Sequence, residues 1–188
     1  LSFGGLKAWE GLRVMSPDAC RPFSLGRNGM VQGEGAAVFV LEDREAALAR
    51  GARVLAEICG VGMTSDASDI VMPNPEGASR AMQRALSDAG WTAESVDHIN
   101  AHGTATTAND RCEAEALRRA LGPRAAEIPV TSTKSLHGHL IGAAGAVELI
   151  GCLLALQEGL IPPTAGFLAS DPDCALDLVT GAARQGRF

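Results

Sequence analysis

The sequence predicts an α/β protein with a mostly parallel β-sheet, and three observations lead to this fold class. Short apolar runs alternate with helical segments in the order β-α-β-α-β-α-β. Such alternation implies parallel strands joined by right-handed crossovers. The 22 Gly residues suit many tight turns between strands and helices. The 188 residues are 46% hydrophobic but include no Tyr, so the core must be built from Ala, Val, Leu and Ile.

The first regular elements are expected after a Gly-rich, irregular start. Residues 36–41 form a short apolar run that is typical of a buried strand. Asp43 is placed to cap a short helix over residues 44–50. Residues 54–62 predict the next strand. The weakest join in the chain is therefore expected between residues 42 and 53.

Two helices with clear start and stop signals are expected in the middle of the chain. Asn74 caps the first helix, and Gly90 ends it. After a strand at residues 96–101, either Asn109 or Asp110 is expected to cap the second helix. The inner face and the end of this second helix carry Ala114, Leu117, Ala120, Leu121 and the pair Gly122-Pro123.

The remaining elements include a helix that is apolar almost all round. Residues 128–131 predict a strand, and residues 143–158 predict a helix with so few polar positions that it should be buried. Gly159 ends this helix, and residues 176–179 form a last short strand. No boundary is expected inside residues 51–188.

Composition excludes several classes of function. The net charge is −6 and no run of Lys or Arg occurs, which argues against a nucleic-acid partner. The five cysteines are scattered and odd in number, so we expect a reducing compartment, the cytoplasm, with no disulfide framework. No apolar run reaches the roughly 18 residues of a membrane span, so none is predicted.

Two histidines each follow a predicted strand, and each is surrounded by Gly and hydroxyl residues. His102 lies in Asn-Ala-His-Gly-Thr-Ala-Thr, and His139 precedes the apolar helix in Gly-His-Leu-Ile-Gly-Ala-Ala-Gly. Ligands of open α/β sheets bind just beyond the carboxyl ends of the strands. Two histidines on successive βα units can therefore face one reaction centre, although each alone also suits a structural turn.

A lysine and a glutamate are expected to share one buried polar network near His139. Lys134 lies between a strand and His139, and Lys is rarely buried unless it is paired. Glu148 lies on the apolar helix, where a lone carboxylate would be costly. His137 and His139 form a His-x-His pair, but no third ligand has suitable spacing, so no metal site is expected.

No nucleophile accompanies these groups. The chain has no Gly-x-Ser-x-Gly elbow. Cys59, Cys112 and Cys152 fall in predicted strands or helices, where they are expected to pack in the core. Cys20 and Cys174 lie in irregular stretches, and none of the five resembles an activated thiol at a helix start. The sequence therefore offers two bases or donors without a nucleophile.

Four ordered motifs resemble β-ketoacyl-acyl carrier protein synthases of the I/II type, the condensing enzymes of fatty acid and polyketide assembly. The two histidine motifs are Asn100-Ala-His-Gly-Thr-x-Thr106 and Ser132-Thr-Lys-Ser-x-x-Gly-His-x-x-Gly-Ala-Ala-Gly-x-x-Glu148. Arg21-Pro-Phe-x-x-x-Arg-x-Gly-x-Val-x-Gly-Glu-Gly35 and Gly62-Met-Thr-Ser-Asp-Ala67 also match. The resemblance covers nearly the whole chain.

The resemblance implies a thiolase-like fold, in which two duplicated halves form α-β-α-β-α layers and the protein is usually a homodimer. Residues 1–50 would be the tail of the N-terminal half. Residues 51–188 would be the C-terminal half without its last strands. The nucleophilic Cys of the family would lie upstream of Leu1, and its closing Phe-Gly-Gly-Thr-Asn segment beyond Phe188. This chain alone is therefore expected to be inactive.

The resemblance also implies a decarboxylative Claisen condensation. An acyl group moves from a carrier-protein thioester to the Cys, and malonyl-carrier protein then loses carbon dioxide and attacks the acyl-enzyme. Donors that stabilise the enolate oxygen are the main requirement. The implied catalytic residues are His102, His139, Lys134 and Glu148, and the implied phosphopantetheine-binding residues are Thr104 and Thr106. The acyl carrier protein would be the partner, and neither a metal nor another cofactor is implied.

Two other interpretations remain open at this stage. A non-condensing partner subunit of the chain-length-factor type tends to lose the Cys and often a histidine, and a scaffold domain of the same fold needs no paired histidines. The two histidines favour the catalytic interpretation. Acyl chain length, the choice between fatty acid and polyketide synthesis, and membership of a larger synthase are not given by the sequence. Docking of an acidic carrier protein would need a local basic patch, for which the candidates are Arg13, Arg118, Arg119 and Arg124.

Overall fold

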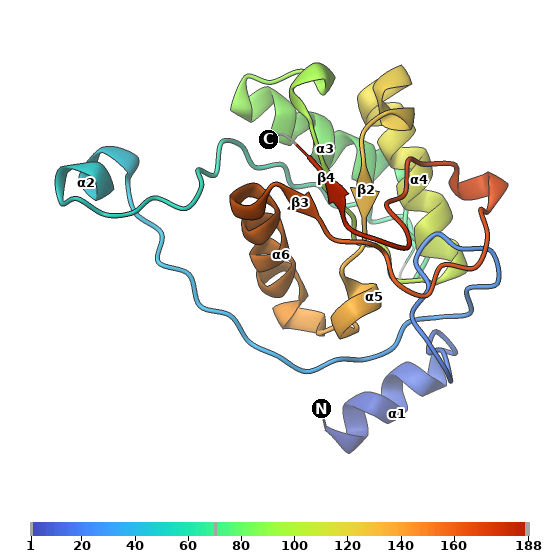
Figure 1. The fold of residues 1–188 in the computed structure, drawn as a ribbon. Helices are drawn as coiled ribbons and strands as arrows, with labels where there is room; N and C mark the ends of the chain where they lie inside the picture. Colours follow the sequence, from blue (N-terminus) through green and yellow to red (C-terminus); the bar gives the residue numbers. More distant parts are fainter. Residues whose placement is uncertain (1, 70, 187–188) are drawn as a thin grey trace.

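The computed structural model describes residues 2–69 and 71–186, and its centre is a short parallel strand pair covered by helices (Figure 1). Strand β1 (Ile99–Asn100) pairs in parallel with β2 (Val130–Thr131), with Ile99 opposite Val130. Two further strands, β3 (Leu160–Ile161) and β4 (Arg184–Gln185), pair antiparallel. The parallel arrangement is therefore confirmed for β1 and β2, whereas the antiparallel pair was not predicted.

Four of the six α-helices in the described chain fall where the sequence places them, whereas the first forms in the start that was expected to be irregular, and the short fifth was not predicted. The α-helices are α1 (Phe3–Gly11), α2 (Arg44–Ala49), α3 (Pro75–Ala89), α4 (Thr107–Leu121), α5 (Lys134–His137) and α6 (Ala144–Glu158). Short 3-10 helices are η1 (Ala93–Ser95), η2 (Gly122–Ala126), η3 (Ile141–Ala143) and η4 (Pro172–Cys174). Two predicted caps are confirmed: the Asp43 side chain accepts from the backbone of Ala46, and that of Asn74 accepts from Glu76.

The predicted cap of α4 is wrong. Neither Asn109 nor Asp110 caps this helix, because the Thr106 side chain accepts from the Asn109 backbone N–H and starts the helix three or four residues earlier than expected. Asp110 turns into the core instead. Its carboxylate accepts from the backbone N–H groups of Phe23, at 2.7 Å, and Ala105, at 3.2 Å. An acidic residue near a helix start thus serves a tertiary contact that the local pattern does not reveal.

The core lies between α4 and the strands. One cluster joins the first part of the chain to this region through Phe23, Ala101, Ala114, Val130 and Cys174. A second cluster, beneath the end of α4, contains Leu117, Leu121, Ala125 and Ile128. Apart from Phe23 and Cys174, these side chains are the small and branched aliphatic residues that the composition requires. The core therefore packs against β1 and β2, the two strands that lead to the histidine motifs.

The strands predicted over residues 36–41, 54–62 and 176–179 do not form in the described chain. Figure 1 shows the first two as parts of a long segment that leaves the body and carries α2 at its far end. Val38 is 93% exposed. The third makes one parallel bridge, from Leu178 to β2. An apolar run needs a neighbouring strand for its backbone hydrogen bonds, and most of these residues find none.

The helix predicted over residues 143–158 is present as α6, but the expectation that it is buried is wrong. Only Ala144 and Ala155 are buried on α6, whereas its exposed large residues are Leu149, Ile150, Leu154 and Leu156. Ile141–Glu158 is also long and apolar enough to cross a membrane, with a mean hydropathy of 1.5 over 18 residues. The expectation that no apolar run reaches this length is therefore wrong. Helices packed on a protein core meet the same criterion.

Candidate functional site

The two motif histidines meet at the ends of β1 and β2. His102 follows β1 after one residue, and His139 lies just beyond α5. Their ring centroids are 5.4 Å apart and the ring planes are nearly perpendicular, at 88°. The fold thus brings two imidazoles from successive βα units to one place.

Lys134 is a buried residue beside the histidine pair. Its side chain is 0% exposed, and it begins α5 three residues after β2. The Nζ atom lies 3.2 Å from His102 Nδ1 and 2.5 Å from the His102 carbonyl oxygen, and it forms an ion pair with Glu148 of α6. An ammonium has three protons to donate. Lys134 therefore has one acceptor for each proton, and it links β1, α5 and α6.

Hydrogen bonds set the tautomers of both rings. The Lys134 ammonium only donates, so Nδ1 of His102 accepts and Nε2 carries the proton. For His139, the backbone N–H of Ile141 donates to Nδ1 at 3.0 Å, which again leaves the proton on Nε2. Ile141 has a φ of 53°, an unusual value for a β-branched residue, and this backbone turn aims its N–H at the ring. Each histidine therefore presents an Nε2–H donor.

The electrostatic surroundings keep both histidines neutral. Burial, then Lys134 and then His139 lower the pKa of His102 to about 4. Burial, then Lys134 and then His137 lower the pKa of His139 to about 4. At neutral pH the two rings are therefore hydrogen-bond donors without charge. Two such donors side by side are suited to stabilising an oxyanion as it forms.

Glu113 of α4 holds the backbone that carries His102. One carboxylate oxygen accepts from the His102 N–H at 2.7 Å, and the other accepts from the Gly103 N–H at 2.8 Å. Burial is the main cause that raises the pKa of Glu113. The turn also requires Gly103, because a Cβ there would lie 2.6 Å from Ser132 and φ is 41°. Glu113 was not predicted as a site residue, because its one signal in the sequence is its place on the inner face of α4.

An extended segment of the first part of the chain holds His139 from the opposite side. The His139 N–H donates to the Val31 carbonyl at 2.7 Å, and the Gly33 N–H donates to the His139 carbonyl at 3.1 Å. A Cβ on Gly33 would lie 2.0 Å from the carbonyl oxygen of His137. The motif that contains Gly33 was noted in the sequence, but its contact with the histidine loop required the structure.

The two threonines after His102 make one local cluster. The hydroxyl oxygens of Thr104 and Thr106 are 2.8 Å apart, and Thr106 also caps α4. Thr104 is buried and Thr106 is half-buried. Their hydroxyls thus stabilise the turn, which accounts for their presence without a ligand. A role in substrate binding stays a prediction.

None of the five cysteines, all of which lie in the described part of the chain, is prepared to act as a nucleophile. All are free, and burial raises the pKa of Cys20 and of Cys174 to about 11. Cys59 is exposed, so the expectation that it packs in the core is wrong. Within residues 2–69 and 71–186, no group of three or more His, Cys, Asp or Glu side chains could hold a metal ion.

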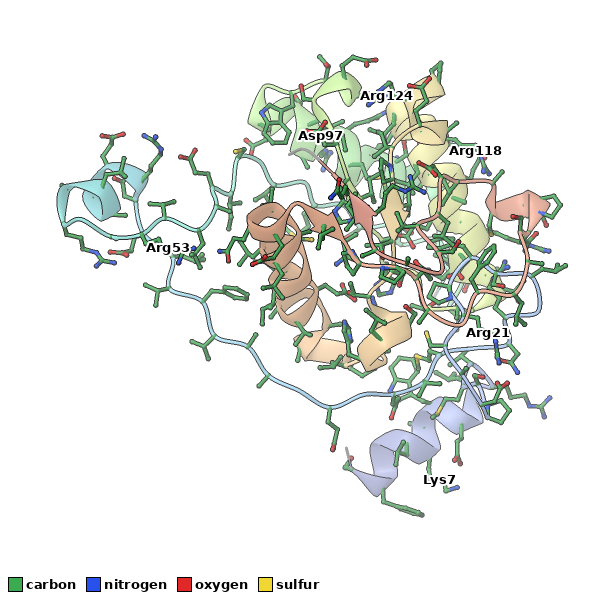
Figure 2. All side chains as sticks on the ribbon, viewed as in Figure 1. Lys7, Arg21, Arg53, Asp97, Arg118 and Arg124 are labelled. Carbon is green, nitrogen blue, oxygen red and sulfur yellow. The ribbon has the colours of Figure 1, made fainter. Side chains whose placement is uncertain are left out.

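The candidate basic patch is largely neutralised. Arg118 and Arg119 both pair with Glu115, and Arg124 pairs with acidic residues on either side. Figure 2 shows Lys7 on α1 and Arg53 near α2, far from Arg118 and Arg124 on the opposite side of the molecule. The cations are thus dispersed over the described surface and mostly paired.

Comparison with known proteins gives matches over most of the chain. Residues 55–168 match the β-ketoacyl synthase C-terminal domain, and residues 1–47 match the β-ketoacyl synthase N-terminal domain. Nodulation protein E of Rhizobium leguminosarum bv. trifolii is 52% identical over 187 residues, which are 100% of this chain and 47% of that protein. The 3-oxoacyl-[acyl-carrier-protein] synthase 2 of Synechocystis is 44% identical over 98% of this chain and 45% of that protein.

A solved structure gives the same result. A type II polyketide synthase acyl-carrier protein in complex with its ketosynthase bound to the hexaketide superposes with a TM-score of 0.95 and 33% identity, over 98% of this chain and 48% of that chain. This likeness confirms the thiolase-like fold. The chain spans about half the length of the curated relatives it matches. The division into residues 1–50 and 51–188 stays a prediction.

Proposed function

The chain belongs to the β-ketoacyl synthase family, and from this we propose that the complete protein is a β-ketoacyl-acyl carrier protein synthase. It would condense an acyl thioester with malonyl-acyl carrier protein to give a 3-oxoacyl-acyl carrier protein in fatty acid or polyketide synthesis. The observation that carries the proposal is the pair of Nε2–H donors on His102 and His139, whose rings are 5.4 Å apart beside a buried Lys134. The nucleophilic Cys would lie outside this chain.

The two histidines would act in the decarboxylation step. When the C–C bond of the malonyl group breaks, carbon dioxide leaves and the electron pair moves through the α-carbon onto the thioester oxygen. Nε2–H donors of His102 and His139 would stabilise this enolate oxygen, and a preorganised donor of this kind is typically worth about 3 kcal/mol. The electron pair of the enolate then returns to the α-carbon. This carbon attacks the acyl-enzyme carbonyl and expels the Cys thiolate. Neutral histidines suit this step because they do not protonate the carbanion.

Lys134 and Glu148 would support this step without contacting the reacting atoms. The positive charge of Lys134 favours negative charge developing in front of the histidines, and its bond to Nδ1 keeps the His102 proton on Nε2. Glu148 compensates the buried ammonium. The Lys134 and Glu148 side chains are 0% and 15% exposed, and electrostatic interactions are stronger between groups that are removed from water.

The acyl carrier protein is the proposed partner. Thr104 and Thr106 lie directly after His102, where their hydroxyls would bond to the amides of a phosphopantetheine arm. The solved ketosynthase complex named above contains an acyl-carrier protein, which supports this partner class. We further propose a cytoplasmic homodimer that needs no metal or other cofactor for the chemistry.

The proposal is tested by incubating the complete protein with an acyl-carrier protein thioester and recording its intact mass. A single acyl adduct on a Cys outside residues 1–188, followed by product formation with malonyl-carrier protein, is the expected result. No adduct together with continued release of carbon dioxide would indicate a chain-length-factor-like partner subunit. Neither an adduct nor carbon dioxide would overturn the proposal and favour a scaffold domain.

A further inference from the structure

His137 has a defined place in the site that the reaction proposed above does not use. It ends α5, one helical turn after Lys134 and two residues before His139. Its ring is half-buried and lines a cavity of about 430 Å³ that also contacts Cys20 and Gln32. Both ring nitrogens have partners: Nδ1 lies 2.8 Å from the Gly138 carbonyl oxygen, and Nε2 lies 3.1 Å from the Thr133 hydroxyl.

The partners fix the direction of these hydrogen bonds. A carbonyl oxygen only accepts, so Nδ1 of neutral His137 carries the proton and Nε2 accepts. The Thr133 hydroxyl must then donate to Nε2. This leaves the Thr133 oxygen free to accept from the Asn100 side-chain amide, which lies 3.4 Å away. His137 thus has the tautomer opposite to that of His102 and His139.

The chain of hydrogen bonds continues to the elements that hold Lys134. The Asn100 amide also donates to the backbone carbonyl of Glu148 at 3.1 Å, and Asn100 Oδ1 lies 3.5 Å from the Thr133 N–H. Asn100 belongs to β1 and precedes His102 by two residues, whereas Thr133 directly precedes Lys134. This series of hydrogen bonds therefore connects β1, α5 and α6. The Lys134 ammonium joins α5 and α6 to His102, which follows β1.

We propose that His137 is a positioning residue for this site: by accepting a hydrogen bond from the Thr133 hydroxyl, its Nε2 orients Thr133 and Asn100, and thereby keeps Lys134 within reach of His102. This inference rests on the proposed condensing function. The His137 ring bonds to Gly138 and Thr133 and not to either motif histidine, so its effect is expected in the decarboxylation step, which needs Lys134 and the histidine pair. Acylation of the Cys does not depend on it.

The experiment uses the two amide side chains that mimic the two ring nitrogens. In the complete protein, His137→Asn keeps a donor near Nδ1 but removes the acceptor at Nε2, whereas His137→Gln keeps an acceptor near Nε2. Carbon dioxide release from malonyl-carrier protein is measured beside acyl transfer from an acyl-carrier protein. Because one hydrogen bond is at stake, His137→Asn is expected to lower decarboxylation about fivefold with acyl transfer unchanged, and His137→Gln to restore most of the rate.

A double variant tests directly whether His137 acts through Thr133. Thr133→Val removes the hydroxyl and is expected to lower decarboxylation about as much as His137→Asn, and the two changes together are expected to cost no more than one. The matched control is Ser135→Ala, which removes a hydroxyl of α5 that takes no part in the hydrogen bonds between His137, Thr133 and Asn100. It should leave the ratio of decarboxylation to acyl transfer unchanged. Multiplying effects of the two substitutions, or equal rates in the Asn and Gln variants, would overturn the proposal.

A second measurement does not depend on activity. Nitrogen-15 shifts of the imidazoles in the complete protein should show the proton of neutral His137 on Nδ1 and that of His139 on Nε2. A proton on Nε2 of neutral His137 would contradict the proposed direction of the chain. A wild-type protein that releases no carbon dioxide would overturn the proposed function and this role together, whereas an active wild type with unaffected His137 variants would overturn this role alone.

Discussion

Replacing the buried ion pair of Lys134 and Glu148 should separate the stability of the protein from its activity. The two side chains are 0% and 15% exposed, so each charge depends on the other for compensation. Glu148→Leu leaves a buried ammonium with two uncharged acceptors on His102 and should lower the free energy of unfolding by about 3–5 kcal/mol. Glu148→Gln keeps an oxygen acceptor and should cost about 1–2 kcal/mol.

The double variant Lys134→Met/Glu148→Leu is the decisive one. Apolar residues of similar volume often replace a buried ion pair with little loss, but the His102 carbonyl and Nδ1 also lose their donor. We therefore expect the double variant to lie within about 2 kcal/mol of the wild type, and thus to be more stable than Glu148→Leu alone. Release of carbon dioxide should nevertheless be lost, because His102 is no longer held or polarised.

The assay is equilibrium unfolding of the complete protein in urea, followed by circular dichroism, with Lys134→Met completing the cycle. An unchanged dependence on urea would show that the folded and unfolded states keep their compactness. A positive coupling of at least about 2 kcal/mol between the two positions is expected for groups in contact. Additive losses would refute the reasoning, since they would show that the two charges do not depend on one another. An active double variant would refute the proposed role of Lys134.

The remaining predictions concern the groups around this pair. His102→Ala or His139→Ala should lower decarboxylation by about a hundredfold or more, measured as carbon dioxide release, while acyl transfer followed by intact mass persists; equal loss of both would contradict their roles. Glu113→Gln should destabilise the protein by about 1–3 kcal/mol in urea unfolding, because the two backbone N–H groups bond to different carboxylate oxygens and Gln replaces one of these with an NH2 group that only donates. Gly33→Ala should lower the melting temperature, because its Cβ would lie 2.0 Å from a carbonyl oxygen of α5, whereas Gly142→Ala has open space and should not. Finally, the two motif histidines have a pKa of about 4 in the folded protein and 6.5 as free side chains, so the unfolded chain takes up protons first as the pH falls. Their contribution to the free energy of unfolding is therefore complete above pH 6.5 and is lost as the pH falls toward 4. Urea unfolding measured across this pH range checks the prediction.

Helices could be predicted where their signals are local. The cap Asn74 and the terminal Gly90 define α3 through contacts within a few residues, and both are present as expected. Asp110 shows where this reasoning fails, because its carboxylate bonds to Phe23, 87 residues away, and leaves the cap to Thr106. A local pattern states what a side chain is able to do, and long-range contacts select among these possibilities.

The failed strands and the exposed face of α6 have a common physical cause. Residues 36–41 and 54–62 have the apolar composition of strands, but a strand is defined by a partner ladder that composition does not contain. In α6, an apolar surface all round was correctly identified, yet burial requires a neighbour on each side. Exposed Leu154 and Leu156 show that the described chain supplies it on only part of the surface.

The site was predicted best where residue types and chemistry coincide. His102, His139, Lys134 and Glu148 could be named from the sequence because buried charges require partners and histidines after strands are suited to ligand contact. The sequence could not supply Glu113 or Gly33, since their role is to hold backbone atoms of the histidine loops. Such residues carry no chemical signature of their own.

Burial, together with the charge of Lys134, keeps the two motif histidines neutral. A free histidine is partly protonated near neutral pH, and a charged imidazolium beside a carbanion would transfer its proton and end the reaction. Burial and the nearby ammonium lower both pKa values to about 4, which removes that proton and leaves the N–H donors. Glu148 keeps the ammonium itself compensated. In the proposed reaction the site would supply positive potential for the enolate from a group whose own protons are all engaged, and donors from groups that carry no charge.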